Sequence, residues 1–315
     1  MTWEKSKKGE YEYWIGKTER LCIQIIPELG SKIISLKDRL TGREWLWRGE
    51  RPLGVPGYGL PFNRGDGAGW DEMFPSINPC LYSKGPWSGI EVPDHGEVWS
   101  IPWEAEMGTN GLSCSVNGIR FPYYLEKRFS FPTPQVIRMD YFLHNLSPFP
   151  FFFLWAAHPL FNIKEGMEIL VPDDLSEVMV SYSFSNRLGK FGDVVDWPIA
   201  ESKNGHICLN KVEWKNSKVA EKFYFNSKLS KGWASLRDSE TGERLTFHFP
   251  VDRVPYLAIW ANYGGFDGNY QVAIEPSTGF LDDLSYAIGE NKISKVEGHS
   301  TYCWFLEVAI ESEEK

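Results

Sequence analysis

Three side chains in this sequence could carry proton-transfer chemistry: His158, Glu275 and His95. His158 lies near the end of the apolar run 149–161, where Phe, Leu and Trp dominate and small residues flank the histidine. Glu275 ends a second apolar stretch, 270–276, and both residues are followed by proline. An ionisable side chain in an apolar segment costs free energy unless it is paired or used. A Glu and a His held across a cleft can move protons in both directions.

The run 149–161 is too short to cross a membrane and is typical of a strand buried on both faces. Pro159 has no backbone donor, so we expect the strand pairing to end there. The alternative for His158 is a core histidine satisfied by one hydrogen bond. The run alone gives both interpretations equal weight.

His95 lies in the segment 93–99, Pro-Asp-His-Gly-Glu-Val-Trp, which indicates a junction between a loop and a strand. Such junctions are favoured positions for functional side chains. If the strand begins early, His95, Glu97 and Trp99 share one face. The alternative is a surface histidine paired with Asp94.

The stretch 51–69 is rich in Gly and Pro and is interpreted as an ordered loop. It lacks the Gly-Lys-Ser/Thr ending of a phosphate-binding loop, and no helix pattern follows it. Asp71 and Glu72 come directly after this loop, beside aromatic residues. They could line a cleft or form a solvated loop edge, and the sequence favours neither.

The elements that must position these residues are strands. Short strands with Gly, Pro and Asn turns follow one another along the chain, and an amphipathic helix pattern is almost lacking. This pattern is typical of an all-β sandwich or barrel. The segment 186–203 is mixed and is interpreted as a loop, whereas 255–262 alternates as a strand should. No shift in composition marks a boundary, so we expect one large β-sandwich domain over 1–315.

Composition excludes several classes of partner. A net charge of −9 argues against nucleic acid and anionic membranes. The charged N-terminal segment has no signal-peptide pattern, and no apolar run reaches membrane length. The five scattered cysteines lack metal-ligand spacing, so we expect free thiols, a reducing cytoplasm and no metal.

Four segments occur in an order that resembles the aldose 1-epimerase family, also called galactose mutarotase-like proteins. They are Trp-Asp-Glu-Met-Phe-Pro at 70–75, Asp-His-Gly-Glu-Val-Trp at 94–99, Ala-His-Pro-Leu-Phe at 157–161, and Ile-Glu-Pro at 274–276. The opening, 30–47, is similar to the first hairpins of that family, so the resemblance covers nearly the whole chain. It implies a large β-sandwich that binds a small-molecule sugar in a cleft and interconverts the α and β anomers of an aldose, with no cofactor.

The resemblance also implies roles for individual residues. His158 matches the general acid of the family and Glu275 its general base, while His95 matches a substrate-binding histidine. We further expect four residues to contact the substrate: Arg64, Asp71, Trp260 and Asn262. The family's substrate-binding aspartate in the middle of the chain has no convincing match here.

Two other classes of function stay open. A glycoside hydrolase needs two carboxyl groups roughly 5–10 Å apart. The candidates for such a pair are Asp71, Glu72, Asp94, Glu97 and Glu275. A sugar-binding protein without turnover would need only the cleft.

Overall fold

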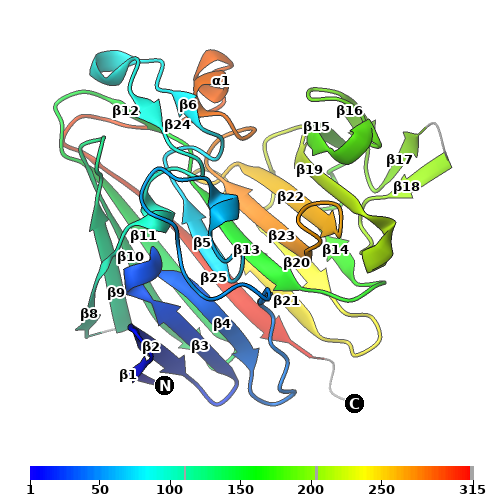
Figure 1. Ribbon diagram of the computed structural model, residues 1–315, viewed down its shortest axis with the longest axis horizontal. Coiled ribbons are helices and arrows are strands. Elements are labelled where there is room, and N and C mark those ends of the chain that lie inside the picture. The colour runs from blue at the N-terminus through cyan, green and yellow to red at the C-terminus, as the bar shows by residue number, and fades with distance from the viewer. Residues whose placement is uncertain (110, 203–204, 313–315) are drawn as a thin grey trace.

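The computed structural model describes residues 1–109, 111–202 and 205–312, and most of its strands belong to two large antiparallel sheets (Figure 1). In spatial order, the eleven-stranded sheet consists of β1 (Thr2–Lys8), β2 (Tyr11–Lys17), β3 (Leu21–Ile26), β4 (Lys32–Asp38), β5 (Trp70–Met73), β13 (Ala156–Asn162), β23 (Tyr270–Ser277), β22 (Tyr256–Tyr263), β19 (Val219–Phe225), β15 (Glu177–Ser183) and β16 (Val194–Asp196). The eight-stranded sheet consists of β14 (Glu168–Leu170), β20 (Trp233–Arg237), β21 (Arg244–His248), β25 (Thr301–Glu311), β11 (Val136–Asn145), β10 (Tyr123–Thr133), β9 (Gly111–Asn117) and β8 (Glu104–Gly108).

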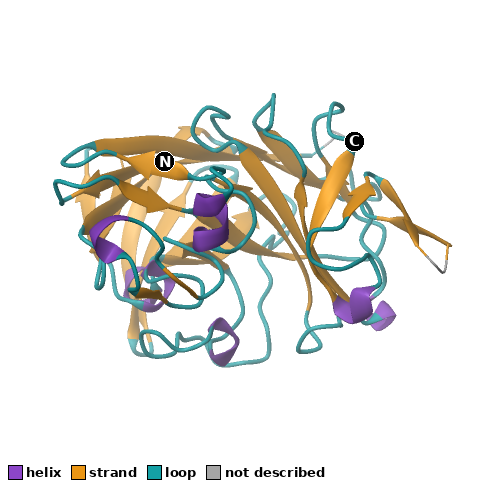
Figure 2. Ribbon diagram, turned by 90° about the horizontal axis from the view of Figure 1, so that it is seen from above, coloured by secondary structure: helices purple, strands orange, loops and turns teal. Residues whose placement is uncertain are grey.

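The remaining elements are short. Three two-stranded sheets pair β6 (Cys80–Leu81) with β7 (Glu91–Val92), β12 (Phe151–Phe153) with β24 (Ser294–Val296), and β17 (Ile199–Ser202) with β18 (Gly205–Cys208). One α-helix is described, α1 (Leu284–Gly289), and the helical turns lie in loops beside the sheets (Figure 2). The expected all-β sandwich is confirmed. In the part of the chain that the structure describes, no helix has the length and apolar character needed to cross a membrane.

β5 joins the two sheets through Glu72, whose side chain points into the core between them. This carboxylate lies 3.1 Å from Lys127 Nζ on β10. It also accepts hydrogen bonds from Tyr141 Oη on β11 at 3.0 Å and from Trp155 Nε1 at 2.7 Å. Glu72 therefore lies neither in a cleft nor on a solvated loop edge, the two positions that the sequence left open.

Between residues 149 and 203, two expectations about strands were wrong. The run 149–161 is two strands, β12 and β13, and Pro159 lies inside β13 instead of ending it. Pro159 pairs with Trp70 on β5, while the register with β23 skips from Ala156 to Leu160. The missing donor of Pro159 is thus accommodated where pairing with β23 is interrupted.

The segment 186–203 is the second correction, because β16 and β17 both form in a region interpreted as a loop. The apolar and polar residues there alternate too weakly to predict strands. β16 pairs with β15, and β17 pairs with β18. Both partners lie outside that segment, and the pairing stabilises the two strands.

We predict that Glu72→Gln destabilises the fold by about 3–5 kcal/mol, because it leaves the buried Lys127 ammonium without its counter-charge. Urea unfolding followed by tryptophan fluorescence measures this loss. Glu104→Gln, at an exposed position on β8, is the matched control and should stay within about 0.5 kcal/mol. Equal stabilities of the two variants would contradict the structural role of Glu72.

Candidate functional site

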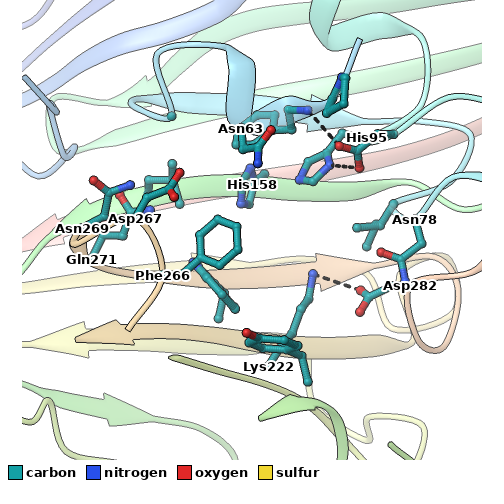
Figure 3. A pocket seen from close by; sticks show the side chains of 18 of the residues that line it. Asn63, Asn78, His95, His158, Lys222, Phe266, Asp267, Asn269, Gln271 and Asp282 are labelled. Atoms are coloured by element: carbon teal, nitrogen blue, oxygen red, sulfur yellow. Dashed lines mark hydrogen bonds and ion pairs between the residues drawn. The ribbon is translucent and has the colours of Figure 1, made fainter. Parts of the chain in front are cut away.

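A cavity of about 370 Å³ opens over the eleven-stranded sheet, and His158 and Glu275 both line it (Figure 3). His158 lies on β13 and Glu275 on the neighbouring strand β23. Their Nε2 and Oε1 atoms are 4.0 Å apart. Both side chains are buried, with exposed fractions of 6% and 0%. The two residues selected for their place in apolar segments therefore meet in one pocket.

Lys222 on β19 also reaches this pair. Its ammonium lies 2.7 Å from Glu275 Oε2 and 2.9 Å from Asp282 Oδ1. Asp282 follows β23 and is also bound by the hydroxyl groups of Tyr224, at 2.9 Å, and Ser181. One buried cation thus holds two carboxylates at the base of the pocket.

Burial sets the protonation of the pair. It raises the pKa of Glu275 to about 7, although the adjacent Lys222 lowers it. Burial also lowers the pKa of His158 well below its ordinary value, and the nearby His95 ring and Lys222 ammonium lower it further. His158 is therefore neutral near pH 7, in contrast to the imidazolium that a general acid would require, and Glu275 titrates near neutrality.

His95 approaches the same pocket from the loop 93–96. Its Nδ1 lies 2.8 Å from Asp94 Oδ1, and its ring stacks on Phe62 with centroids 4.1 Å apart. Burial is the largest single effect on the pKa of Asp94 and raises it, but the contacts with the His95 ring and the hydrogen bonds from the backbone amides of Phe62 and His95 together outweigh burial and lower that pKa. The ionised Asp94 carboxylate thus accepts a hydrogen bond from Nδ1–H, which leaves Nε2 as the ring nitrogen that can contact a ligand.

Gly96 allows the loop 93–96 to pack closely against the backbone of Phe74. It has φ of +75°, and a Cβ there would lie 2.0 Å from the carbonyl oxygen of Phe74. Glycine is needed for that close approach. The expected strand that would align His95, Glu97 and Trp99 does not form, because Glu97 turns inward and accepts hydrogen bonds from Tyr58 and Tyr123 at 2.6 and 2.9 Å.

Of the four other residues that we expected to contact the substrate, one lines the pocket and three do not. Trp260 lines the pocket, whereas Arg64, Asp71 and Asn262 do not. Arg64 is exposed on a turn whose neighbours Phe62 and Asn63 face the cavity.

Asp71 and Asn262 are buried and already bonded. Asp71 pairs in register with His158, but its carboxylate lies against Lys32, with Oδ2 and Nζ 3.1 Å apart. The side chain of Asn262 bonds the backbone of Phe266 twice, at 2.9 and 3.1 Å. Both residues therefore support the walls of the pocket and do not line it.

Sequence reasoning missed Lys222, Asp282 and Gln271. Lys222 lies in the buried strand 219–225, so the rule that selected Glu275 would also have selected it. Asp282 lies in a loop, where an aspartate carries no such signal. Among the described residues, no group of three or more His, Cys, Asp or Glu side chains is arranged to hold a metal ion.

Comparison with known proteins shows what this architecture is similar to. No family model matches the chain, and no curated protein matches it. Solved structures do match over nearly the full length. A Synechocystis sp. PCC 6803 protein is 16% identical with a TM-score of 0.71, and the match covers 98% of this chain and 97% of that one.

Two further structures carry descriptive names. A galactose mutarotase related enzyme from Lactobacillus acidophilus is 15% identical, with a TM-score of 0.68 and coverage of 95% and 97%. A galactose mutarotase-like protein from Lactobacillus casei is 17% identical, with a TM-score of 0.65 and coverage of 95% and 100%. The chain therefore has the galactose mutarotase-like fold that the sequence motifs implied.

Proposed function

We propose that the protein interconverts the α and β anomers of an aldose, with His158 and Glu275 as the proton-transfer pair. The observation that carries this proposal is the 4.0 Å approach of His158 Nε2 and Glu275 Oε1 inside one buried, ligand-sized cavity. The galactose mutarotase-like fold supports it. Acid/base catalysis needs groups whose pKa values lie near the working pH, and Glu275, with a pKa of about 7, meets that need.

The pKa order suggests how one proton serves the reaction. Below about pH 7 the pair holds one proton, which resides on Glu275 while His158 is neutral. In ring opening, Glu275 gives its proton to the ring oxygen, and the bond from that oxygen to C1 breaks. His158 takes the proton of the anomeric hydroxyl, and C1 becomes an aldehyde carbon.

Ring closure reverses these transfers. After rotation about the C1–C2 bond, His158 returns its proton to the aldehyde oxygen while the attacking hydroxyl gives its proton to Glu275. The pair ends as it began, so the cycle needs no other reactant. Each group acts as acid and base in turn. The resemblance assigned His158 as the acid and Glu275 as the base of ring opening, and this scheme exchanges the two roles because the proton of the pair resides on Glu275.

The alternatives receive less support. Three of the five carboxylates that a hydrolase could use, Asp71, Glu72 and Glu97, lie outside the cavity lining. A binding protein without turnover would have no use for a Glu275 pKa near neutrality. Tight sugar binding without faster anomer exchange would identify such a protein.

We predict that Glu275→Gln lowers kcat for anomer exchange by about 10²- to 10⁴-fold, because the amide keeps the shape and cannot transfer the proton. His158→Asn should lose a similar factor, and the double variant should lose less than the product, since the two residues act as a unit. Exchange is measured by polarimetry or two-dimensional exchange NMR. Glu290→Gln, exposed after α1, is the control. A folded Glu275→Gln protein with wild-type exchange would remove Glu275 from the mechanism.

His95 should orient a sugar hydroxyl without moving the reacting proton. We predict that His95→Asn raises KM several-fold with little change in kcat, since one neutral hydrogen bond contributes about 0.5–1.5 kcal/mol. His248→Asn, exposed on the other sheet, serves as the control. A collapsed kcat with unchanged KM would show instead that His95 belongs to the proton-transfer machinery.

A further inference from the structure

The pocket extends well beyond the reacting pair. In Figure 3, Asn78 and Asp282 lie at one end, Asp267, Asn269 and Gln271 lie at the other, and His158 and Lys222 lie between them. The cavity is therefore elongated, with polar side chains at both ends.

Strand register gives the length of this extension. Along β22 and β23, Glu275 lies beside Ala258, Ala273 beside Trp260, and Gln271 beside Asn262. Glu275 and Gln271 are four residues apart on one face of β23, which corresponds to about 13 Å along the strand. The two ends of a pyranose ring, O1 and O4, are roughly 5–6 Å apart by ordinary bond lengths. One ring at Glu275 thus leaves room for a second ring toward Gln271.

The side chain of Gln271 indicates a ligand contact at the far end of the cavity. The side chain is 4% exposed and lines the cavity. Its Oε1 has no hydrogen-bond partner among the described residues. A buried amide oxygen without a partner is costly, and a ligand hydroxyl that donates to it would relieve that cost.

Aromatic residues form the wall between the reacting pair and Gln271. Trp260 and Phe266 line the cavity with ring centroids 5.9 Å apart. Phe266 is 40% exposed, and Asn262 fixes its loop through two hydrogen bonds. A half-exposed aromatic ring held in place offers an apolar surface to the C–H face of a sugar ring.

The charges at this end are already paired. Arg51 Nη2 lies 3.1 Å from Asp267 Oδ2, which joins the loop 51–69 to the loop that carries Phe266. The guanidinium of Arg51 also donates to the backbone carbonyl groups of Asn63 and Gly65. An uncharged, hydroxyl-bearing ring therefore suits this end better than a phosphate or carboxylate group.

We infer that the pocket contains a second sugar subsite, formed by Trp260, Phe266 and Gln271, and that the ligand is an uncharged reducing disaccharide. This inference rests on the proposed function, which places the reducing ring at His158 and Glu275. The second ring packs against Trp260 and Phe266, and one of its hydroxyl groups donates to Gln271 Oε1.

The test compares glucose and galactose with maltose, cellobiose and lactose. Affinities are measured by NMR titration of the Glu275→Gln protein, where turnover does not interfere, and anomer exchange is measured on the wild type. At least one disaccharide should bind about tenfold or more tightly than either monosaccharide. Gln271→Ala should reduce that preference roughly three- to tenfold, the effect of one hydrogen bond, and Trp260→Ala should reduce it further. Gln135→Ala, exposed in the turn between β10 and β11 of the other sheet, should leave the preference unchanged.

The outcomes separate the subsite from the reaction. A disaccharide preference that Gln271→Ala reduces, without exchange of any sugar, would retain the subsite and refute the proposed function. Accelerated exchange of monosaccharides with no disaccharide preference would retain the function and overturn the subsite. A preference that Gln271→Ala and Trp260→Ala leave intact would overturn the assignment of these residues, and failure of every disaccharide to bind would overturn the subsite as a whole.

Discussion

The site depends on the two ion pairs that the Lys222 ammonium makes with Glu275 and Asp282. The ammonium lies 2.7 Å from Glu275 and 2.9 Å from Asp282, in a region where both carboxylates are almost fully buried. Two buried carboxylates without a cation would repel one another and would be costly to desolvate. The same ammonium lowers the pKa of Glu275 against the larger effect of burial, and it helps to keep His158 neutral. Lys222 therefore connects the stability of the site with its protonation.

The two acidic residues of β5 stabilise the site without lining the pocket. Its adjacent residues Asp71 and Glu72 point to opposite faces of the sheet, as alternation along a strand requires. Glu72 binds Lys127 in the core between the sheets, and Asp71 binds Lys32 beside His158. Both are buried ion pairs that fix β5, and β5 in turn fixes β13 and the position of His158.

The sequence predicted the sandwich and the two central residues because both follow from local patterns. Short strands with turn residues indicate the fold, and an ionisable group in an apolar strand indicates His158 and Glu275. Asp71 and Asn262 could not be placed the same way, because their partners, Lys32 and the backbone of Phe266, are determined by tertiary contacts. Asp282 was missed for the same reason, since only its contacts with Tyr224 and Lys222 distinguish it from a loop aspartate.

The most direct test of the account is the pH dependence of anomer exchange by the wild-type protein, measured from pH 5.5 to 9 and corrected for the uncatalysed reaction. A pair that must hold one proton loses it as pH rises through the Glu275 pKa of about 7 in the free protein, so kcat/KM should fall above that pH. Lys222→Met removes a cation that lowers the pKa of both Glu275 and His158, so its decline should begin at higher pH. A kcat/KM that stays level or rises up to pH 9 would contradict catalysis by a singly protonated His158 and Glu275 pair.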